Sequence, residues 1–245
     1  MRYVVILIFS LSYIGLHCQM VSDRAVLFRA GEVTSLASLT HEIQKKTSVP
    51  IWIYTVNNLN RKTSIEYAQK LIASHPVGIR GINNGVIILI AKNDHTIHIL
   101  NGFGMEWLLP DKECQAIIDK MIPDFQNKQF YKGIIPALDS IASRADSADW
   151  SIHNLATDEM KNGAIYKTEY SDRMRNAFYR HVKESEPQFS NQYRITLAMD
   201  GTDFYLYYSK YMTDLIKQIT ASNKVTIYFR VENLKEKKLQ LLGVE

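Results

Sequence analysis

Four acidic side chains lie beside predicted loops or at the ends of predicted elements, where oxygen ligands for a cation could gather. These acids are Asp23, Asp94, Glu106 and Asp111. Carboxylate oxygens are preferred ligands of calcium and magnesium. A cation held in this way can supply a metal-bound water for hydrolysis of a phosphoester. The acids are therefore candidate ligands for a divalent cation.

The topology of an α/β sheet predicts where such side chains meet. Ligands of an open α/β sheet gather beyond the carboxyl ends of its parallel strands. We expect four loop side chains to converge there if the loops fold back, namely Asp23, Asn57, Asn84 and Glu106. Among these, Glu106 has the least obvious structural role, so it is the first candidate for a catalytic residue.

Several of these candidates also have a simpler structural interpretation. Asp111 follows a proline at the start of a predicted helix, where Asp commonly caps the helix. Asp94 lies in a predicted tight turn, where Asp bonds its own backbone. Residues 83–85 could be only a turn before a strand, with no role in binding a ligand. Gly102 and Gly104 could cradle an anion with their backbone N–H groups, although a single G-x-G pattern has low specificity.

Hydrophobic periodicity predicts the elements that position these residues. Two mainly apolar segments, 49–56 and 85–91, are typical of buried strands. The helix between them makes a right-handed parallel crossover, and the tight turn at 92–95 leads to an antiparallel edge strand at 96–101. Residues 21–28 are expected to be a linker. Helices are predicted from apolar spacing in the segments 33–46, 63–72, 110–121 and 130–141.

The remaining residues, 150–245, predict a separate small α+β module after a polar linker. Asp200-Gly201 supplies the turn of a hairpin. Its tyrosines could form a binding face, although cross-strand aromatic pairing is the commoner explanation. The expected elements are a helix at 172–183, hairpin strands at 192–198 and 203–208, a helix at 212–219 and a strand at 225–231.

The first 18 residues have the pattern of a secretory signal peptide. Arg2 precedes a short apolar run that is brief for a spanning helix. No second apolar stretch is long enough to span a bilayer, so we expect an exported chain, periplasmic or secreted, with no transmembrane helix once mature. A lipid anchor at Cys18 is the less favoured alternative, because His17 stands where a small residue is expected. Cys114 is expected to be a buried small hydrophobe.

Composition excludes some partners. The full chain has a net charge of +4, with 46% hydrophobic and 22% charged residues. These values are typical of a globular protein. The positive charge is too mild to indicate a nucleic-acid binder, and no Lys/Arg run interleaved with aromatic residues occurs.

The order of short motifs in residues 20–145 resembles the TPM domain. The resemblance implies an extracytoplasmic, three-layer α/β/α sandwich with a mixed sheet. Where that family usually has Asp-Asn-Gly, this chain has Asn83-Asn84-Gly85, and it has His95 where an Arg is frequent. Both changes remove charge from the region where a metal or phosphate would lie. The motifs are V-S-D, I-N-N-G-V-I-I-L-I-A, N-D-H, N-G-F-G-M-E, L-P-D and F-Y-K-G.

The resemblance implies two kinds of function. The favoured one is a binding or accessory factor for assembly or quality control, with a membrane or envelope protein as partner and a calcium or magnesium ion in its acidic loops. The alternative is a low-turnover, metal-dependent phosphomonoesterase using Glu106, Asp23 and Asp111, so whether the chain is an enzyme stays open. The predicted metal ligands are Asp23, Asn84, Glu106 and Asp111.

Overall fold

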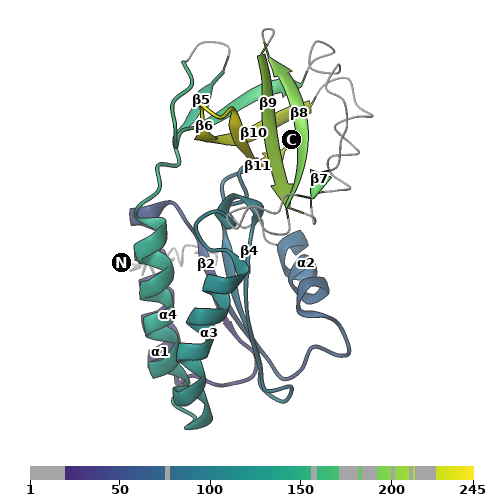
Figure 1. Cartoon of the computed structure of the whole chain (residues 1–245). Coiled ribbons are helices and arrows are strands. Elements are labelled where there is room, and N and C mark those ends of the chain that lie inside the picture. The colour runs from purple at the N-terminus through teal and green to yellow at the C-terminus, as the bar shows by residue number, and fades with distance from the viewer. Residues whose placement is uncertain are drawn as a thin grey trace, which may run out of the picture.

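The structure is a computed structural model with two parts, an α/β part below and a β part above in the view of Figure 1. The predicted leader at 1–18 lies outside the described residues. The structure describes residues 20–74, 78–155, 159–170, 182–183, 192–199, 202–209, 212 and 225–245.

The first part is built on a mixed four-stranded sheet in the order β1-β2-β3-β4. Its strands are β1 (Val21–Asp23), β2 (Ile51–Val56), β3 (Val86–Ala91) and β4 (Thr96–Asn101). β2 and β3 are parallel, and β4 returns antiparallel to β3. The predicted crossover and turn are confirmed. The expected linker at 21–28 is wrong at its start, because β1 pairs in parallel with β2.

Helices cover both faces of this sheet, which confirms the three-layer prediction. The helices are α1 (Ala30–Thr47), α2 (Ser64–Ser74), α3 (Asp111–Gln126) and α4 (Phe130–Ala145). In Figure 1, α2 stands apart from the other three. Because successive strand residues point to opposite faces, Ile51 and Ile53 pack with α1, α3 and α4, whereas Trp52 and Tyr54 share a core with α2. Among the described helices, none is both long and apolar enough to cross a membrane.

Local sequence explains where α2 begins. The Thr63 hydroxyl accepts from the Glu66 backbone N–H at 3.2 Å, and the Glu66 carboxylate accepts from the Thr63 N–H at 2.7 Å. These two reciprocal hydrogen bonds form a capping box, which the T-x-x-E pattern at residues 63–66 favours. Its hydrogen bonds hold the pKa of Glu66 below its usual value.

The second part contains a seven-stranded sheet in the order β5-β6-β10-β11-β9-β8-β7. The predicted antiparallel hairpin is confirmed in β8 and β9, and the predicted third strand in β10. The helix expected at 172–183 is wrong at its end, where β7 lies. The rest of that segment and the helix expected at 212–219, except Met212, lie outside the described residues. The strands are β5 (Ile152–Asn154), β6 (Ile165–Tyr170), β7 (Val182–Lys183), β8 (Gln192–Met199), β9 (Thr202–Ser209), β10 (Val225–Asn233) and β11 (Lys238–Val244).

Residues of both parts pack together in one hydrophobic core. Tyr228 of β10 and Leu242 of β11 are buried in the same core as strand residues of the first sheet. Figure 1 shows the second sheet above the end of the first sheet where β4 finishes. We call this end of the four-stranded sheet the amino end, because β2 and β3 begin there, and the opposite end the carboxyl end.

Candidate functional site

Asp23 ends β1 and holds the loop that leads into α1. Its Oδ1 accepts from the Leu27 N–H at 3.0 Å and from the Thr55 hydroxyl, and its Oδ2 accepts from the Phe28 N–H at 2.9 Å. Thr55, in turn, is fully buried and accepts from the Ala25 N–H at 3.0 Å. Both carboxylate oxygens of Asp23 are therefore engaged in fixing the β1–α1 loop.

A second acid, Asp94, joins two other loops at the same end of the sheet. Its Oδ2 accepts from the Leu59 N–H at 2.7 Å, which ties the β3–β4 turn to the loop after β2. The Asn93 N–H donates to the Asn57 carbonyl at 2.8 Å, and the Lys92 ammonium donates to the Ala25 carbonyl at 3.2 Å. The carboxyl end is thus three loops bonded to one another.

Asn84 lies at the amino end, just before β3, and is fully buried. Its Oδ1 accepts from the Ile79 N–H at 2.7 Å, and its Nδ2 donates to the Ser48 carbonyl at 3.1 Å. The side chain therefore joins the 78–85 loop to the C-terminal end of α1. A buried amide that satisfies two backbone groups is a structural element.

The Gly102 and Gly104 backbone does not form an anion cradle. The Gly102 N–H donates to the Gly85 carbonyl at 2.9 Å, and the Gly104 N–H donates to the Asn83 carbonyl at 3.3 Å. A Cβ on Gly104 would lie 2.2 Å from the Ile82 carbonyl oxygen. The glycines are required because two backbone segments approach each other closely, and their donors are already engaged.

Glu106 follows the short 3-10 helix η1 (Phe103–Met105), and it is partly buried. The η1 segment lies between the two cores, because Met105 is buried in the core of the first sheet and Phe103 packs on that of the second. Strand β11 contacts η1 directly. The second sheet therefore covers the turn that carries the first candidate catalytic residue.

Aromatic and charged contacts strengthen this cover. The Arg230 guanidinium lies 3.8 Å from the centre of the Trp107 ring, a cation–π contact. The Tyr228 hydroxyl donates to Glu245 at 2.7 Å, and Glu245 pairs with Arg80 at 2.6 Å. Burial and Glu245 raise the pKa of Tyr228. These side chains come from both parts of the chain, so they lock the second sheet onto the amino end.

The sequence-predicted site residues are divided between the two ends. Asp23 pairs with Thr55 near the carboxyl end of β2, whereas Asn84 precedes Val86, which pairs with Ile51 at the amino end. At about 3.3 Å per strand residue, this places Asp23 and Asn84 roughly 20 Å apart. The expected convergence of Asp23 and Asn57 with Asn84 and Glu106 is therefore wrong, because it ignored that Asn84 and Glu106 lie at the opposite end.

The divided set does not fit one calcium or magnesium ion. Within the part of the chain that the structure describes, no three His, Cys, Asp or Glu side chains are grouped closely enough to hold a metal. Asp23 and Asn84 already bond backbone groups at separate ends. A cation bound only between Glu106 and Asp111 stays a prediction.

Asp111 and Cys114 occupy the first turns of α3. The cap residue is Pro110, so the expectation that Asp111 caps the helix is wrong by one residue. Asp111 is instead the first helical residue, where an acid is favoured by the helix dipole. Cys114 is buried, as predicted, and burial with nearby Asp111 raises the pKa of its thiol to about 12. Such a thiol is unreactive at neutral pH.

A cavity of about 340 Å³ lies elsewhere, at the C-terminal ends of α1 and α4. Its lining includes the Lys46–Asp146 ion pair, with 2.7 Å between the ammonium and the carboxylate, and Trp150. None of the sequence-predicted site residues lines it.

The basic side chains of the carboxyl end were not predicted from the sequence. Arg24, Arg61, Lys62 and Lys92 come from three loops and are all exposed there. The adjacent pair Arg61-Lys62 was the only local signal. The set becomes apparent only when the parallel pairing of β1, β2 and β3 brings the loops together.

Comparison with known proteins identifies the family of the first part. The TPM domain model matches residues 21–144, about half of the chain. No functionally curated protein matches the sequence.

Similar solved structures include three NMR structures of bacterial proteins. An N-terminal domain from P. gingivalis is 22% identical with a TM-score of 0.48, covering 52% of this chain and 82% of that one. The N-terminal domain of cg2496 from Corynebacterium glutamicum is 14% identical with a TM-score of 0.42, covering 61% and 93%. BA42 from Bizionia argentinensis is 16% identical with a TM-score of 0.42, covering 48% and 81%.

Proposed function

The chain belongs to the TPM domain family, and on this premise we propose that it is an exported binding or accessory factor. Its role would be in assembly or quality control of a membrane or envelope protein. The alternative is a metal-dependent phosphomonoesterase. TPM domains are generally extracytoplasmic, and the signal-peptide pattern of residues 1–18 supports export of this member.

One observation carries the proposal: two of the oxygen-bearing side chains expected to form a hydrolytic site, Asp23 and Asn84, are occupied in holding loops at separate ends of the sheet. Asp23 accepts hydrogen bonds from Leu27 and Phe28, and Asn84 bonds Ile79 and Ser48. Metal-assisted hydrolysis requires several such oxygens around one ion and its water. A rigid scaffold with fixed loops and a covered end is better suited to recognition.

The position of Glu106 adds support. Its turn is packed between the two cores, with Met105 fully buried beside it and Arg230 lying over Trp107 on the other side. A phosphoester at this turn would have to displace packing between the two sheets. The geometry thus favours Glu106 as part of the interface between the two parts of the chain.

The test is hydrolysis of an aryl phosphate by the mature chain. Wild type and Glu106→Gln are assayed side by side with calcium, with magnesium and with a chelator. Glu236→Gln, at an exposed residue of the turn between β10 and β11, serves as the matched control. We expect no turnover above the buffer rate under any condition. Metal-dependent turnover in wild type and the control that disappears in Glu106→Gln would establish the phosphatase alternative.

A further inference from the structure

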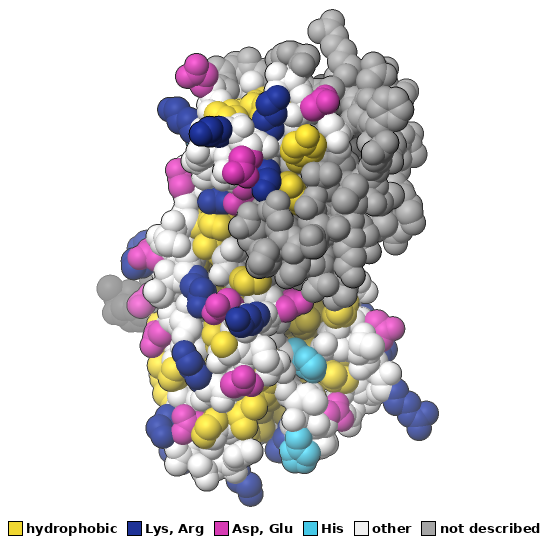
Figure 2. Space-filling model, viewed as in Figure 1, with side chains coloured by type: hydrophobic (Ala, Val, Ile, Leu, Met, Phe, Trp, Pro, Cys, Tyr) yellow, Lys and Arg dark blue, Asp and Glu magenta, His cyan; other side chains and the backbone are white. Residues whose placement is uncertain are grey.

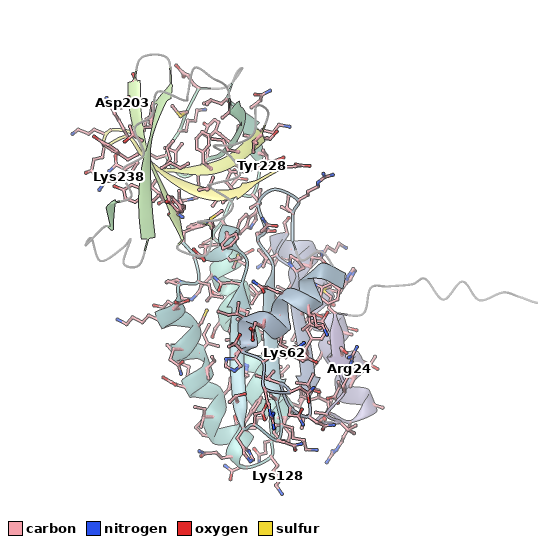
Figure 3. The ribbon with its side chains drawn as sticks, turned by 90° about the vertical axis from the view of Figure 1, so that its right-hand side faces the viewer. Arg24, Lys62, Lys128, Asp203, Tyr228 and Lys238 are labelled. Carbon is pink, nitrogen blue, oxygen red and sulfur yellow. The ribbon has the colours of Figure 1, made fainter. Side chains whose placement is uncertain are left out.

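The carboxyl end of the first sheet carries a set of exposed cations that we call the basic end. They come from the β1–α1 loop, the loop after β2, the β3–β4 turn and the α3–α4 turn. Figure 3 shows Arg24, Lys62 and Lys128 on the half of the molecule away from Tyr228. The basic end comprises Arg24, Arg29, Arg61, Lys62, Lys92 and Lys128, all exposed.

Three carboxylates of this region are engaged by other groups of the protein. Asp23 and Asp94 accept hydrogen bonds from loop backbone, and Asp124 pairs with Lys132 at 2.8 Å. None of the six cations of the basic end forms an ion pair with another described residue. Lys62 lies beside Lys70, which lowers the pKa of Lys62. The exposed carboxylate of Glu66 acts on Lys62 in the opposite direction, and Glu32 accepts from the Arg29 N–H at 2.7 Å, so these acids offset part of the positive charge that faces solvent.

The loops that present these cations have constrained backbones. Five of the eight described non-glycine residues with positive φ lie in this region. Val26 is the least expected of them, because a β-branched residue rarely adopts a φ of +51°. Backbone conformations of this kind persist where the surrounding structure enforces them, and they cluster at functional sites. The five residues are Val26, Asn60, Arg61, His95 and Lys128.

Apolar side chains are exposed among the cations. Val26 is 78% exposed, Ile65 in the first turn of α2 is 41% exposed, and Ile122 near the end of α3 is 36% exposed. These are three of the four large hydrophobic residues found exposed in the described part of the chain. Figure 2 shows yellow apolar side chains between dark blue ones along the lower edge of the same view as Figure 1.

We propose that the basic end docks on an anionic phospholipid surface. Lys and Arg side chains bind lipid phosphates, and the exposed Val26 and Ile65 enter the headgroup layer, as in other peripheral surfaces that combine basic and apolar residues. The cations arise from four separate segments, a spread that suits a plane of phosphates better than one small anion. The apolar residues among them favour a lipid surface over an acidic protein.

Docking of this kind is reversible and dependent on salt. Each Lys or Arg near an anionic bilayer contributes about a fivefold gain in affinity, and screening by salt reduces it. The loop carboxylates Asp23 and Asp94, together with Glu32 and Glu66 in the first turns of α1 and α2, offset part of that gain. The basic end would therefore orient the chain at a membrane rather than anchor it there permanently.

The test is sedimentation of the mature chain with phosphatidylcholine vesicles that contain or lack phosphatidylglycerol. We expect binding only to the anionic vesicles, and loss of binding in high salt. The double variant Arg61→Gln/Lys62→Gln should bind roughly 25-fold more weakly, from two cations at about fivefold each. Val26→Asn, which removes the apolar group at a φ that Asn tolerates, should bind roughly fivefold more weakly.

The matched control is Lys235→Gln/Lys237→Gln, which removes the same charge from the exposed turn between β10 and β11. It should leave vesicle binding unchanged, and melting curves check that each variant folds. Absence of binding to anionic vesicles would overturn the proposal, as would equal losses in the control. Binding to soluble polyglutamate but not to vesicles would overturn it in favour of an acidic protein partner. Inorganic phosphate that displaces the chain at matched ionic strength would point to a small-anion site instead.

The inference goes beyond the proposed accessory role and can fail separately from it. Turnover of an aryl phosphate would overturn the accessory role and leave the vesicle result standing. Failure to bind vesicles would remove the docking surface and leave the accessory role in place.

Discussion

The two ends of the four-stranded sheet are built from similar loops but have different surroundings. At the amino end, the 78–85 loop and the turn around η1 are covered by the second sheet, and Tyr228 and Leu242 complete a core there. At the carboxyl end, the loops after β1, β2 and β3 carry exposed Arg and Lys side chains. One end is used for packing within the chain, and the other presents charge to solvent.

The difference shows that an acid in a loop of an α/β sheet need not be a ligand. Asp23 at the open end bonds two backbone N–H groups, as Asn84 does with one N–H and one carbonyl at the covered end. In both places the polar side chain fixes the loop. The surroundings of the two ends differ: exposed cations such as Arg61 lie at one end, and Trp107 contacts Arg230 and Trp150 at the other.

Among the predicted differences between the two ends, the largest should be in the reaction rate of a cysteine thiol. Cys114 contacts the Leu109 carbonyl at the covered end, with 3.5 Å between sulfur and oxygen, and burial raises the pKa of its thiol to about 12. A thiol introduced by Lys62→Cys in a Cys114→Ala background lies at the open end, with an expected pKa of about 8.5. At about pH 8, the mature wild type should therefore react with a maleimide roughly a thousandfold more slowly than that variant.

Unfolding in urea is the control for this experiment, because Cys114 should then react as fast as the introduced thiol. If the maleimide reaction rates of the two thiols in the folded proteins were within tenfold of each other, Cys114 would not be buried at a covered amino end.

Loop-fixing side chains at both ends should contribute to stability independently of calcium. Asn84→Ala leaves two buried backbone groups unpaired, so we expect it to lower the free energy of unfolding by about 3 kcal/mol. Asp23→Ala removes hydrogen bonds from two N–H groups in a half-buried place, so we expect about 2 kcal/mol. Asp94→Ala, which loses its bond from Leu59, should cost about 1 kcal/mol. Urea unfolding with calcium and with a chelator measures all three.

The effect of calcium on stability distinguishes the two roles of Asp23, a side chain that fixes a loop by hydrogen bonds or a ligand of the cation. If calcium stabilises the wild type and Asp23→Ala removes that gain, Asp23 is a cation ligand and its structural role is secondary. An equal loss with and without calcium is the result expected from its hydrogen bonds.

Much of the fold follows from the sequence, because long periodic segments dominate the first part. The strand at 86–91 is apolar throughout, and the Thr63–Glu66 capping box marks the start of α2. β1 was missed because three residues are too short for a pattern, and its pairing with β2 depends on residues about thirty positions away. β11 was missed for a similar reason, since its pairing with β10 and β9 is tertiary.

The candidate site was harder to predict than the fold. Residue type suggested ligands at Asp23 and Asn84, but only the three-dimensional arrangement shows where their oxygens are directed. The donors of Gly102 and Gly104 were expected to meet an anion and meet carbonyls of the 82–85 segment instead. The basic end was not predicted because its six cations are scattered over more than a hundred residues.

Hydrogen–deuterium exchange of the mature chain with and without anionic vesicles tests the different roles of the two ends most directly. The account predicts that vesicles slow exchange in the loops at 24–29, 57–63 and 92–95 and leave the turn at 102–107 unchanged. Slowed exchange at 102–107, or no change in the three loops, would contradict it.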